Sequence, residues 1–161
     1  MTIYVYDTEA NGLLDTVDKI HCLSFKRLNE DMMNTVHNDF NGLFRDGDTW
    51  IAHNQFSYDL PLLVKLGIIK DFTVNSVTTM DDTIINVQFI DTLALSREHF
   101  PDRPRGHGLL PWSKELGTYK PQIDDWENLE LKDYIERCEE DVLSTEAVFL
   151  FLADKLGIEY D

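Results

Sequence analysis

Short runs of β-branched and aromatic residues alternate with polar turns in the first third of the chain, a pattern typical of strands. Three of these runs follow one another through polar turns, which favours an antiparallel meander. Two later runs of the same kind predict further strands beyond the meander. The five predicted strands cover residues 3–7, 20–27, 32–37, 50–53 and 84–90.

Helical spacing of apolar residues is strongest at the carboxyl-terminal end of the chain. We expect the apolar side chains of residues 131–155 to be core rather than a partner surface. Gly67 is placed to end an earlier helix, and the composition of residues 101–106 predicts a loop. The predicted helices cover residues 40–45, 59–66, 93–98, 109–116 and 131–155. Strands that alternate with helices in this way predict an α/β fold.

Two carboxylates, Asp7 and Glu9, end the first predicted strand. Because side chains alternate between the two faces of a strand, Asp7 and Glu9 point the same way and lie a few ångströms apart. Two like charges this close repel unless a positive group lies between them, and a hard divalent cation is the usual partner of such carboxylates. A pair of solvated turn residues is the alternative explanation.

Two further acidic residues lie at positions from which they could join Asp7 and Glu9 in a metal site. Asp59 falls at the start of a predicted helix, followed by Pro61, where an acidic residue also serves as a helix cap. Asp141 lies within the long carboxyl-terminal helix, where it is one of several acids and a plain solvated position is the alternative. Either residue taken alone is weak support for a metal site.

Together these segments resemble the DEDD family of 3′–5′ exonucleases, also called DnaQ-like, over nearly the whole chain. The likeness is closest to the proofreading domain of family A DNA polymerases from short-tailed phages. The motifs that carry it are Asp7-Thr8-Glu9 with Ala10 to Leu14, His53-Asn54 with Tyr58-Asp59, Ile90-Asp91-Thr92-Leu93, His107-Gly108-Leu109, and Cys138-Glu139-Glu140-Asp141-Val142. The resemblance implies an RNase H-like fold, with a central mixed five-stranded sheet that contains the three-stranded meander and is flanked by helices.

The resemblance also implies roles for individual residues. Four carboxylates are expected to bind two metal ions and to form the catalytic site: Asp7, Glu9, Asp59 and Asp141. Leu13 matches the apolar residue that wedges against the terminal base, and Asn54 is expected close to the substrate. Thr8 and Phe56 complete the expected substrate contacts.

The chemistry of such a site follows from the residue types. Phosphodiester hydrolysis places negative charge on the attacking water, the nonbridging oxygens and the leaving 3′-oxygen. Two divalent ions about 3.5–4 Å apart can hold the nucleophile and the leaving group in line. Oxygen ligands without a Cys/His pattern favour Mg²⁺ or Mn²⁺ over zinc. No His-Glu-x-x-His or Cys-x-x-Cys motif is present.

The third motif departs from the family pattern. Family members carry a Tyr four residues, or a His five residues, before the last Asp, and these positions here hold Arg137 and Glu136. The nearest tyrosine, Tyr134, lies one further helical turn away. Two readings of Arg137 stay open: a catalytic clamp on the scissile phosphate, or an ion pair with Asp141 or a neighbouring Glu.

Length and composition predict one globular domain over residues 1–161, with 43% hydrophobic residues. The chain lacks an apolar run long enough for a signal peptide or a membrane span, so we expect a cytoplasmic protein that does not bind membranes. Cys22 and Cys138 are expected to be structural thiols.

The net charge of −16 is unfavourable for nonspecific nucleic-acid binding. The least acidic stretch, residues 97–120, holds five basic and three acidic side chains, a net of +2. We expect substrate to approach across this stretch. A solvated loop without substrate contacts is the alternative.

Three functions fit the sequence. The leading one is a metal-dependent 3′–5′ exonuclease that hydrolyses single-stranded DNA ends to mononucleotides, either free-standing or proofreading in trans to a separate polymerase subunit. The second is a noncatalytic RNase H-like subunit that binds a polymerase or nucleic-acid ends. The third keeps the chemistry and replaces the substrate by short RNA. The intact set of four carboxylates argues against the noncatalytic reading.

Overall fold

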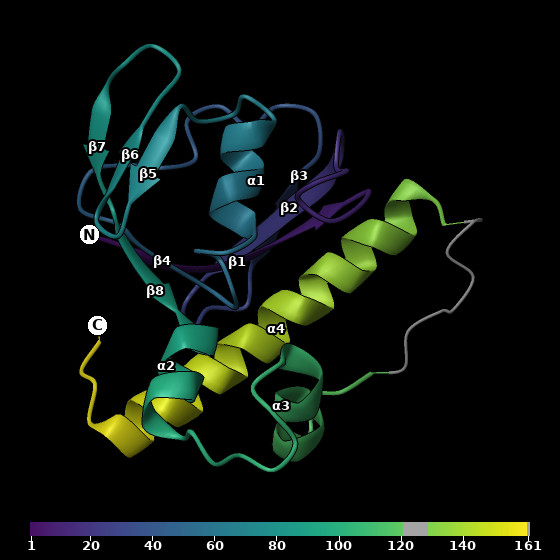
Figure 1. Cartoon of the computed structure of the whole chain (residues 1–161), viewed down its shortest axis with the longest axis vertical. Coiled ribbons are helices and arrows are strands. Elements are labelled where there is room, and N and C mark those ends of the chain that lie inside the picture. The colour runs from purple at the N-terminus through teal and green to yellow at the C-terminus, as the bar shows by residue number, and fades with distance from the viewer. Residues whose placement is uncertain (121–128, 161) are drawn as a thin grey trace.

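The computed structural model describes residues 1–120 and 129–160. A five-stranded sheet forms the centre of the molecule, with the strand order β3-β2-β1-β4-β8 (Figure 1). The five strands are β1 (Ile3–Ala10), β2 (Ile20–Arg27), β3 (Met33–Val36), β4 (Thr49–Ala52) and β8 (Gln88–Asp91). The predicted meander and the mixed sheet are both confirmed, because β1, β2 and β3 pair antiparallel while β4 pairs parallel with β1 and with β8.

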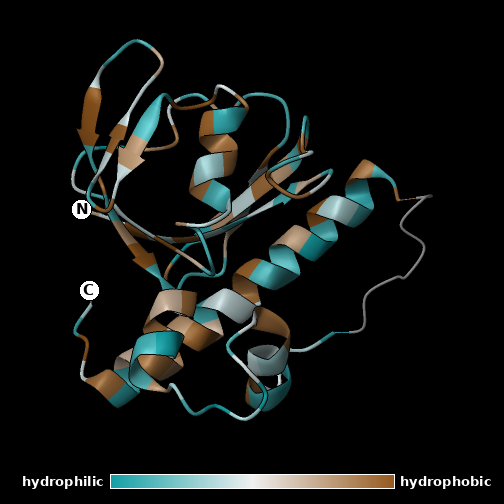
Figure 2. Cartoon of the chain, viewed as in Figure 1, coloured by the Kyte–Doolittle hydropathy of each residue, from teal (hydrophilic) through white to brown (hydrophobic). Residues whose placement is uncertain are grey.

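Helices cover both faces of this sheet. The helix α1 (Asp59–Lys65) packs on one face and the long helix α4 (Leu131–Leu156) on the other (Figure 1). Side chains along β1 point alternately to the two faces of the sheet. Tyr6 therefore packs in the core on the α1 side, and Val5 packs in the core on the α4 side. Polar and apolar residues alternate along α4, as expected for a helix with one buried face (Figure 2). Within the described part of the chain, no helix is long and apolar enough to cross a membrane.

A second, three-stranded antiparallel sheet lies beside α1 and contains β5 (Asp71–Thr73), β6 (Ser76–Thr78) and β7 (Ile84–Asn86) (Figure 1). Neither β5 nor β6 is predicted from the sequence. The predicted single strand over residues 84–90 is wrong, because the chain changes sheets at Val87. The Val87 side chain is buried and its N–H donates to the Asn75 carbonyl at 3.2 Å.

The predicted helix over residues 40–45 is also wrong. This segment is a loop in which Gly42 adopts a positive φ of 71°, a conformation that ends helical geometry. Phe44 explains the apolar character of the loop, because its ring is buried and packs against Trp50 at a centroid distance of 4.9 Å. The apolar residues here anchor a loop to the core instead of forming a helical stripe.

Two short helices, α2 (Thr92–His99) and α3 (Leu109–Leu116), lie beside α4 (Figure 1). The predicted bounds of α3 are confirmed, as are those of β2. At the start of α4, Glu130 and Asp133 form a reciprocal capping box, and Gly157 ends the helix with a φ of 67°. The long helix is therefore fixed at both ends by local sequence signals.

A buried ion pair joins α4 to the sheet. The ammonium group of Lys26 on β2, 4% exposed, donates to both carboxylate oxygens of Glu146 on α4 at 2.5 and 2.6 Å. The backbone N–H of Asn29 donates to the same carboxylate at 2.9 Å. Since α4 carries Asp141 and β2 supports β1, this pair contributes to the placement of the site described below.

We predict that Glu146→Leu destabilises the protein by about 3 kcal/mol, because it leaves the Lys26 ammonium buried without its counter-charge. The double variant Lys26→Met/Glu146→Leu should recover most of this loss, since an apolar pair removes the uncompensated charge. Urea denaturation of the wild type and both variants measures the difference. If Glu146→Leu is as stable as the double variant, the ion pair does not hold α4 to β2.

Candidate active site

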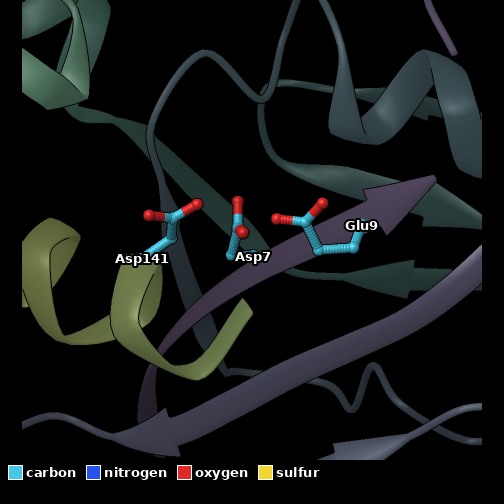
Figure 3. Close-up of side chains that lie close together, drawn as sticks. All are labelled: Asp7, Glu9 and Asp141. Carbon is cyan, nitrogen blue, oxygen red and sulfur yellow. The ribbon is translucent and has the colours of Figure 1, made fainter. Parts of the chain in front are cut away.

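Three carboxylates from two elements meet at the surface between β1 and α4. Asp7 and Glu9 lie on β1, and Asp141 lies on α4. One carboxylate oxygen of each lies within 4.8 Å of the others. Figure 3 shows the three side chains converging from the strand and the helix. The expectation that Asp7 and Glu9 share one face of the strand is confirmed.

Burial and mutual repulsion perturb all three groups. Burial is the main cause that raises the pKa of Asp7 well above its usual value, followed by the charges of Asp141, Asp59 and Glu9. Burial likewise raises the pKa of Glu9 to about 7 and that of Asp141 to about 6, although Arg137 acts in the opposite direction on both. A cluster of carboxylates whose charged forms are disfavoured in this way is a candidate functional site.

The environment of Asp7 fits a cation. Its Oδ2 is buried and has no hydrogen-bond partner among residues 1–120 and 129–160. Below it, the Cys138 thiol donates to the Asp7 carbonyl oxygen at 3.2 Å and so ties α4 to β1. An unsatisfied buried carboxylate oxygen beside two further carboxylates matches the hard oxygen ligands that Mg²⁺ and Mn²⁺ take. Cys22 and Cys138 are both buried free thiols, as expected for structural residues.

Asp59 reaches the cluster from the opposite face of the sheet. It opens α1, is 3% exposed, and accepts a hydrogen bond at Oδ1 from the Thr8 hydroxyl. Burial raises the pKa of Asp59 to about 7, and the negative charge of Asp59 in turn raises the pKa values of Asp7 and Glu9. Asp59 thus lies beside the cluster but is not one of the three carboxylates whose oxygens lie within 4.8 Å of one another. The expected substrate residue Thr8 is buried, with its side chain directed to Asp59.

Asn54 and Phe56 lie on a loop that one carboxylate fixes. Asn54 has a positive φ of 70°, an uncommon conformation that its surroundings must stabilise. The Asp91 carboxylate accepts hydrogen bonds from the backbone N–H of Asn54 at 2.8 Å and from that of Phe56 at 3.1 Å. The same carboxylate caps α2 by accepting from Leu93 N–H at 3.0 Å.

Gln55, between those two residues, is fully buried. Its Oε1 accepts from the Tyr6 hydroxyl at 2.7 Å, and its Nε2 donates to the carbonyls of Trp50 at 3.1 Å and Ile90 at 2.7 Å. One side chain therefore connects β1, β4 and β8 directly beneath the loop. Contacts with the centre of the sheet thus help to set the loop geometry, together with the local bond from Tyr58 N–H to the Asn54 carbonyl at 3.0 Å.

Leu13 is 73% exposed, as a residue that contacts a substrate base must be. The segment that carries it is held from α1: the Tyr58 hydroxyl donates to the Gly12 carbonyl at 2.7 Å, and the Lys65 ammonium donates to the Leu14 carbonyl. The backbone of this segment is thereby anchored while the Leu13 side chain is free to meet a ligand.

Arg137 is half-buried and lies close enough to the cluster to lower the pKa values of Glu9 and Asp141. It also lowers the pKa of Glu140, although burial of Glu140 outweighs it. Tyr134, one turn earlier on α4, is stacked on the His21 ring at a centroid distance of 3.8 Å. The tyrosine that precedes Arg137 on α4 is therefore engaged with β2. A different tyrosine, Tyr58, lies near the cluster, since burial, together with the charges of Asp59, Glu9 and Asp7, raises its pKa.

Three positioning roles are not predicted from the sequence. Asp91 and Cys138 stand in the motifs that carry the resemblance without a contact assigned to them, and Gln55 is not among the candidate residues. A local signal existed for Asp91, which precedes the helical run Thr92–His99 as an N-cap residue would. The partners of Gln55 and Cys138 lie up to 131 residues away in sequence, and no local pattern indicates such contacts.

No protein-family model and no curated protein sequence matches the chain. Solved structures share its fold. NrnC from Brucella melitensis with bound Mg²⁺ superposes with a TM-score of 0.65 at 16% identity, covering 98% of this chain and 74% of that one. Exonuclease X in complex with 5′-overhanging duplex DNA gives 0.54 at 14% identity, over 98% and 94% of the two chains. Phi29 DNA polymerase complexed with primer-template DNA gives 0.57 at 10% identity, over 99% and 32%.

At these identities the likeness is one of fold. The predicted fold class is confirmed: the chain has an RNase H-like fold with a central mixed five-stranded sheet. The small antiparallel sheet beside it is an addition to the prediction. The carboxylate cluster lies on the first strand and the last long helix of this fold.

We predict that the metal-free protein loses stability as the pH rises from about 5 to about 8. Glu9, Asp59 and Asp141 have raised pKa values of about 7, 7 and 6, so the folded protein binds protons more tightly than the unfolded chain in this range. The stabilisation is present at low pH and is lost as the pH passes these values. Thermal midpoints in EDTA should fall by roughly 5–10 °C.

Asp141→Asn removes one of the three groups with a raised pKa and also a charge that raises the pKa of Glu9, so it should flatten this pH dependence. Asp154→Asn, at an exposed position of the same helix, should not. Addition of Mg²⁺ should raise the wild-type midpoint most at the upper end of the pH range. Equal slopes for the wild type and Asp141→Asn would contradict repulsion within the cluster.

Proposed function

We propose that this protein is a divalent-metal-dependent 3′–5′ exonuclease that hydrolyses single-stranded DNA ends to mononucleotides. The observation that carries the proposal is the convergence of Asp7, Glu9 and Asp141, with a buried carboxylate oxygen of Asp7 that lacks a hydrogen-bond partner in the described part of the chain. The shared fold with NrnC and exonuclease X supports a nuclease. A noncatalytic scaffold would gain nothing from the mutual repulsion of these three carboxylates.

Asp7, Glu9 and Asp141 would hold one Mg²⁺ or Mn²⁺ ion, and Asp59 would contribute to a second one beside it. When bound, such ions stabilise the charge that develops on the attacking and leaving oxygens of a phosphodiester. The protein supplies their position: Cys138 fixes the backbone of Asp7, and the Thr8 hydroxyl orients Asp59. The NrnC structure with bound Mg²⁺ is consistent with this choice of ion.

The surroundings of the carboxylate cluster suit the 3′ end of a single-stranded nucleic acid. Leu13 exposes its side chain on an anchored segment, where it would pack against the terminal base. Asn54 and Phe56 lie on the loop that Asp91 fixes, where they would contact the last nucleotides. Unpaired ends should be favoured, because extracting a base from a duplex costs a few kcal/mol.

Arg137 would contact the scissile phosphate in place of the family's Tyr or His. Its position beside Glu9 and Asp141 places a positive charge where a phosphate must approach a cluster of carboxylates. A planar guanidinium donates two parallel hydrogen bonds to such a group. In the metal-free protein, the same charge offsets part of the repulsion among the carboxylates.

Two features of the biological setting belong to this proposal. By its likeness to the exonuclease domains of short-tailed-phage polymerases, the chain would act in the cytoplasm and proofread in trans to a separate polymerase.

A second candidate substrate is a very short oligonucleotide, including RNA. A structure of Brucella melitensis NrnC bound to pGG, with a TM-score of 0.65 and 19% identity, favours it.

Incubating single-stranded DNA labelled at its 5′ end with the protein and Mg²⁺ or Mn²⁺ tests the proposal. We expect products that shorten by one nucleotide at a time, with no labelled mononucleotide at the first time point. EDTA should abolish the reaction. Asp7→Asn should lower kcat/KM by at least about 10²- to 10³-fold, because it removes a metal ligand. The same assay with labelled RNA ranks the two substrates.

Asp154→Asn is the matched control, since it makes the same chemical change at an exposed position of α4 and should retain full activity. Undiminished cleavage in EDTA, or an unaffected Asp7→Asn variant, would rule out the metal site. Release of a labelled mononucleotide from the first time point would reverse the proposed polarity.

We predict that Arg137→Ala lowers kcat/KM by roughly 30- to 1000-fold, the effect of losing a charged hydrogen bond to the reacting phosphate. Arg137→Lys keeps the charge but not the two parallel donors, and it should recover only part of the activity. Steady-state kinetics with both variants and with Arg27→Ala, an exposed arginine at the end of β2, provide the comparison. Full activity of Arg137→Ala would leave Arg137 as an ion-pair residue only.

A further inference from the structure

A cavity of about 450 Å³ lies between α4 and the segment that joins α2 to α3. Three aromatic rings, two arginines and one acid contribute to its lining: Phe100, Trp112, Phe151, Arg103, Arg105 and Glu115. The volume lies in the range of small-ligand pockets. None of these residues takes part in the carboxylate cluster or in the loop that carries Asn54 and Phe56.

Arg103 forms a rigid flat surface in this cavity. Its guanidinium lies 3.4 Å from the centroid of the Trp112 ring, forms an ion pair with Glu115 at 2.8 Å, and donates through Nε to the Gly106 carbonyl at 2.9 Å. The side chain is 11% exposed. A guanidinium held over a ring, with Phe100 and Phe151 lining the same cavity, offers a planar cationic group and aromatic rings, both of which nucleobases stack on.

Arg105 supplies a different property. It lines the same cavity but is exposed, so its guanidinium is available to a ligand at the rim. The stretch 97–120 that contains both arginines has a net charge of +2 in a chain of −16. An anionic ligand that approaches this acidic protein is therefore attracted here more than elsewhere along the sequence. A ligand that fits both features is planar and negatively charged, as a nucleotide is.

Hydrogen bonds connect the cavity to the candidate active site. Trp112 Nε1 donates to Ser96 Oγ at 2.9 Å, and Ser96 Oγ bonds the Nδ1 of His107 at 2.7 Å. The His107 carbonyl in turn bonds Nε2 of His53, the neighbour of Asn54, at 2.9 Å. Along α4, Phe151 lies ten residues beyond Asp141, a rise of about 15 Å.

We propose that this cavity is a second nucleotide subsite, which binds a base and its phosphate in the part of a single strand that lies 5′ of the end being cleaved. The inference rests on the proposed exonuclease function and adds to it a contact distant from the reacting phosphate. The base stacks on the Arg103 surface and the phosphate accepts from Arg105. Longer strands occupy both sites, while the shortest substrates occupy the carboxylate site alone.

The test compares a deoxydinucleotide with a deoxydecanucleotide as substrates of the wild type and of Arg105→Glu. The exposed position of Arg105 makes this variant compatible with the fold. The KM for the decanucleotide should rise about tenfold, equivalent to about 1.4 kcal/mol, while kcat stays unchanged. The KM for the dinucleotide should change less than about twofold, since the dinucleotide is too short to reach the cavity.

Arg27→Glu is the matched control, because it changes the net charge equally at an exposed residue at the far end of β2. It should leave both KM values at the wild-type level. An equal rise of both KM values in Arg105→Glu, or no change in either, would overturn the subsite.

Binding of a fluorescent decanucleotide in EDTA separates this inference from the proposed function. If the wild type binds the decanucleotide and Arg105→Glu binds it about tenfold more weakly, the subsite holds even when no cleavage is found. If the wild type cleaves DNA but Arg105→Glu binds and cleaves as the wild type does, the exonuclease function holds and the subsite is wrong.

Discussion

Repulsion among half-buried carboxylates is the constraint on which the rest of this structure depends. Asp7, Glu9 and Asp141 lie together although burial and their mutual charges disfavour ionisation. An arrangement of this kind persists only where the surrounding structure imposes it. Here the long helix supplies the constraint, through the Lys26–Glu146 pair and the bond from Cys138 to the backbone of Asp7.

The first strand distributes the site between two layers. Because its side chains alternate, Asp7 and Glu9 face α4, while Thr8 between them faces α1 and holds Asp59. One short peptide thereby links carboxylates that come from opposite faces of the sheet. Neither layer alone assembles the site, so the core packing on both sides determines its geometry.

Sequence reasoning succeeded where the signal is local. The period of two along β1 predicted the shared face of Asp7 and Glu9, and the bounds of β2 and α3 agree with the pattern of residues. It failed where tertiary contacts decide. The run 84–90 is β-branched or aromatic at five of its seven positions, and only its packing reveals the change of sheet at Val87. The support that Asp91 gives to Asn54 likewise depends on the fold, which brings together residues 37 apart.

The buried amide of Gln55 has a consequence for the chemical lifetime of the protein. Its Nε2 donates to two carbonyls at once, so deamidation to glutamate would turn this donor into an acceptor facing two other acceptors. The new carboxylate would also lie in the sheet centre beside Tyr6. The amide at this position is therefore needed as a donor, and loss of its nitrogen atom would remove the side-chain bonds to β4 and β8 under the loop that carries Asn54.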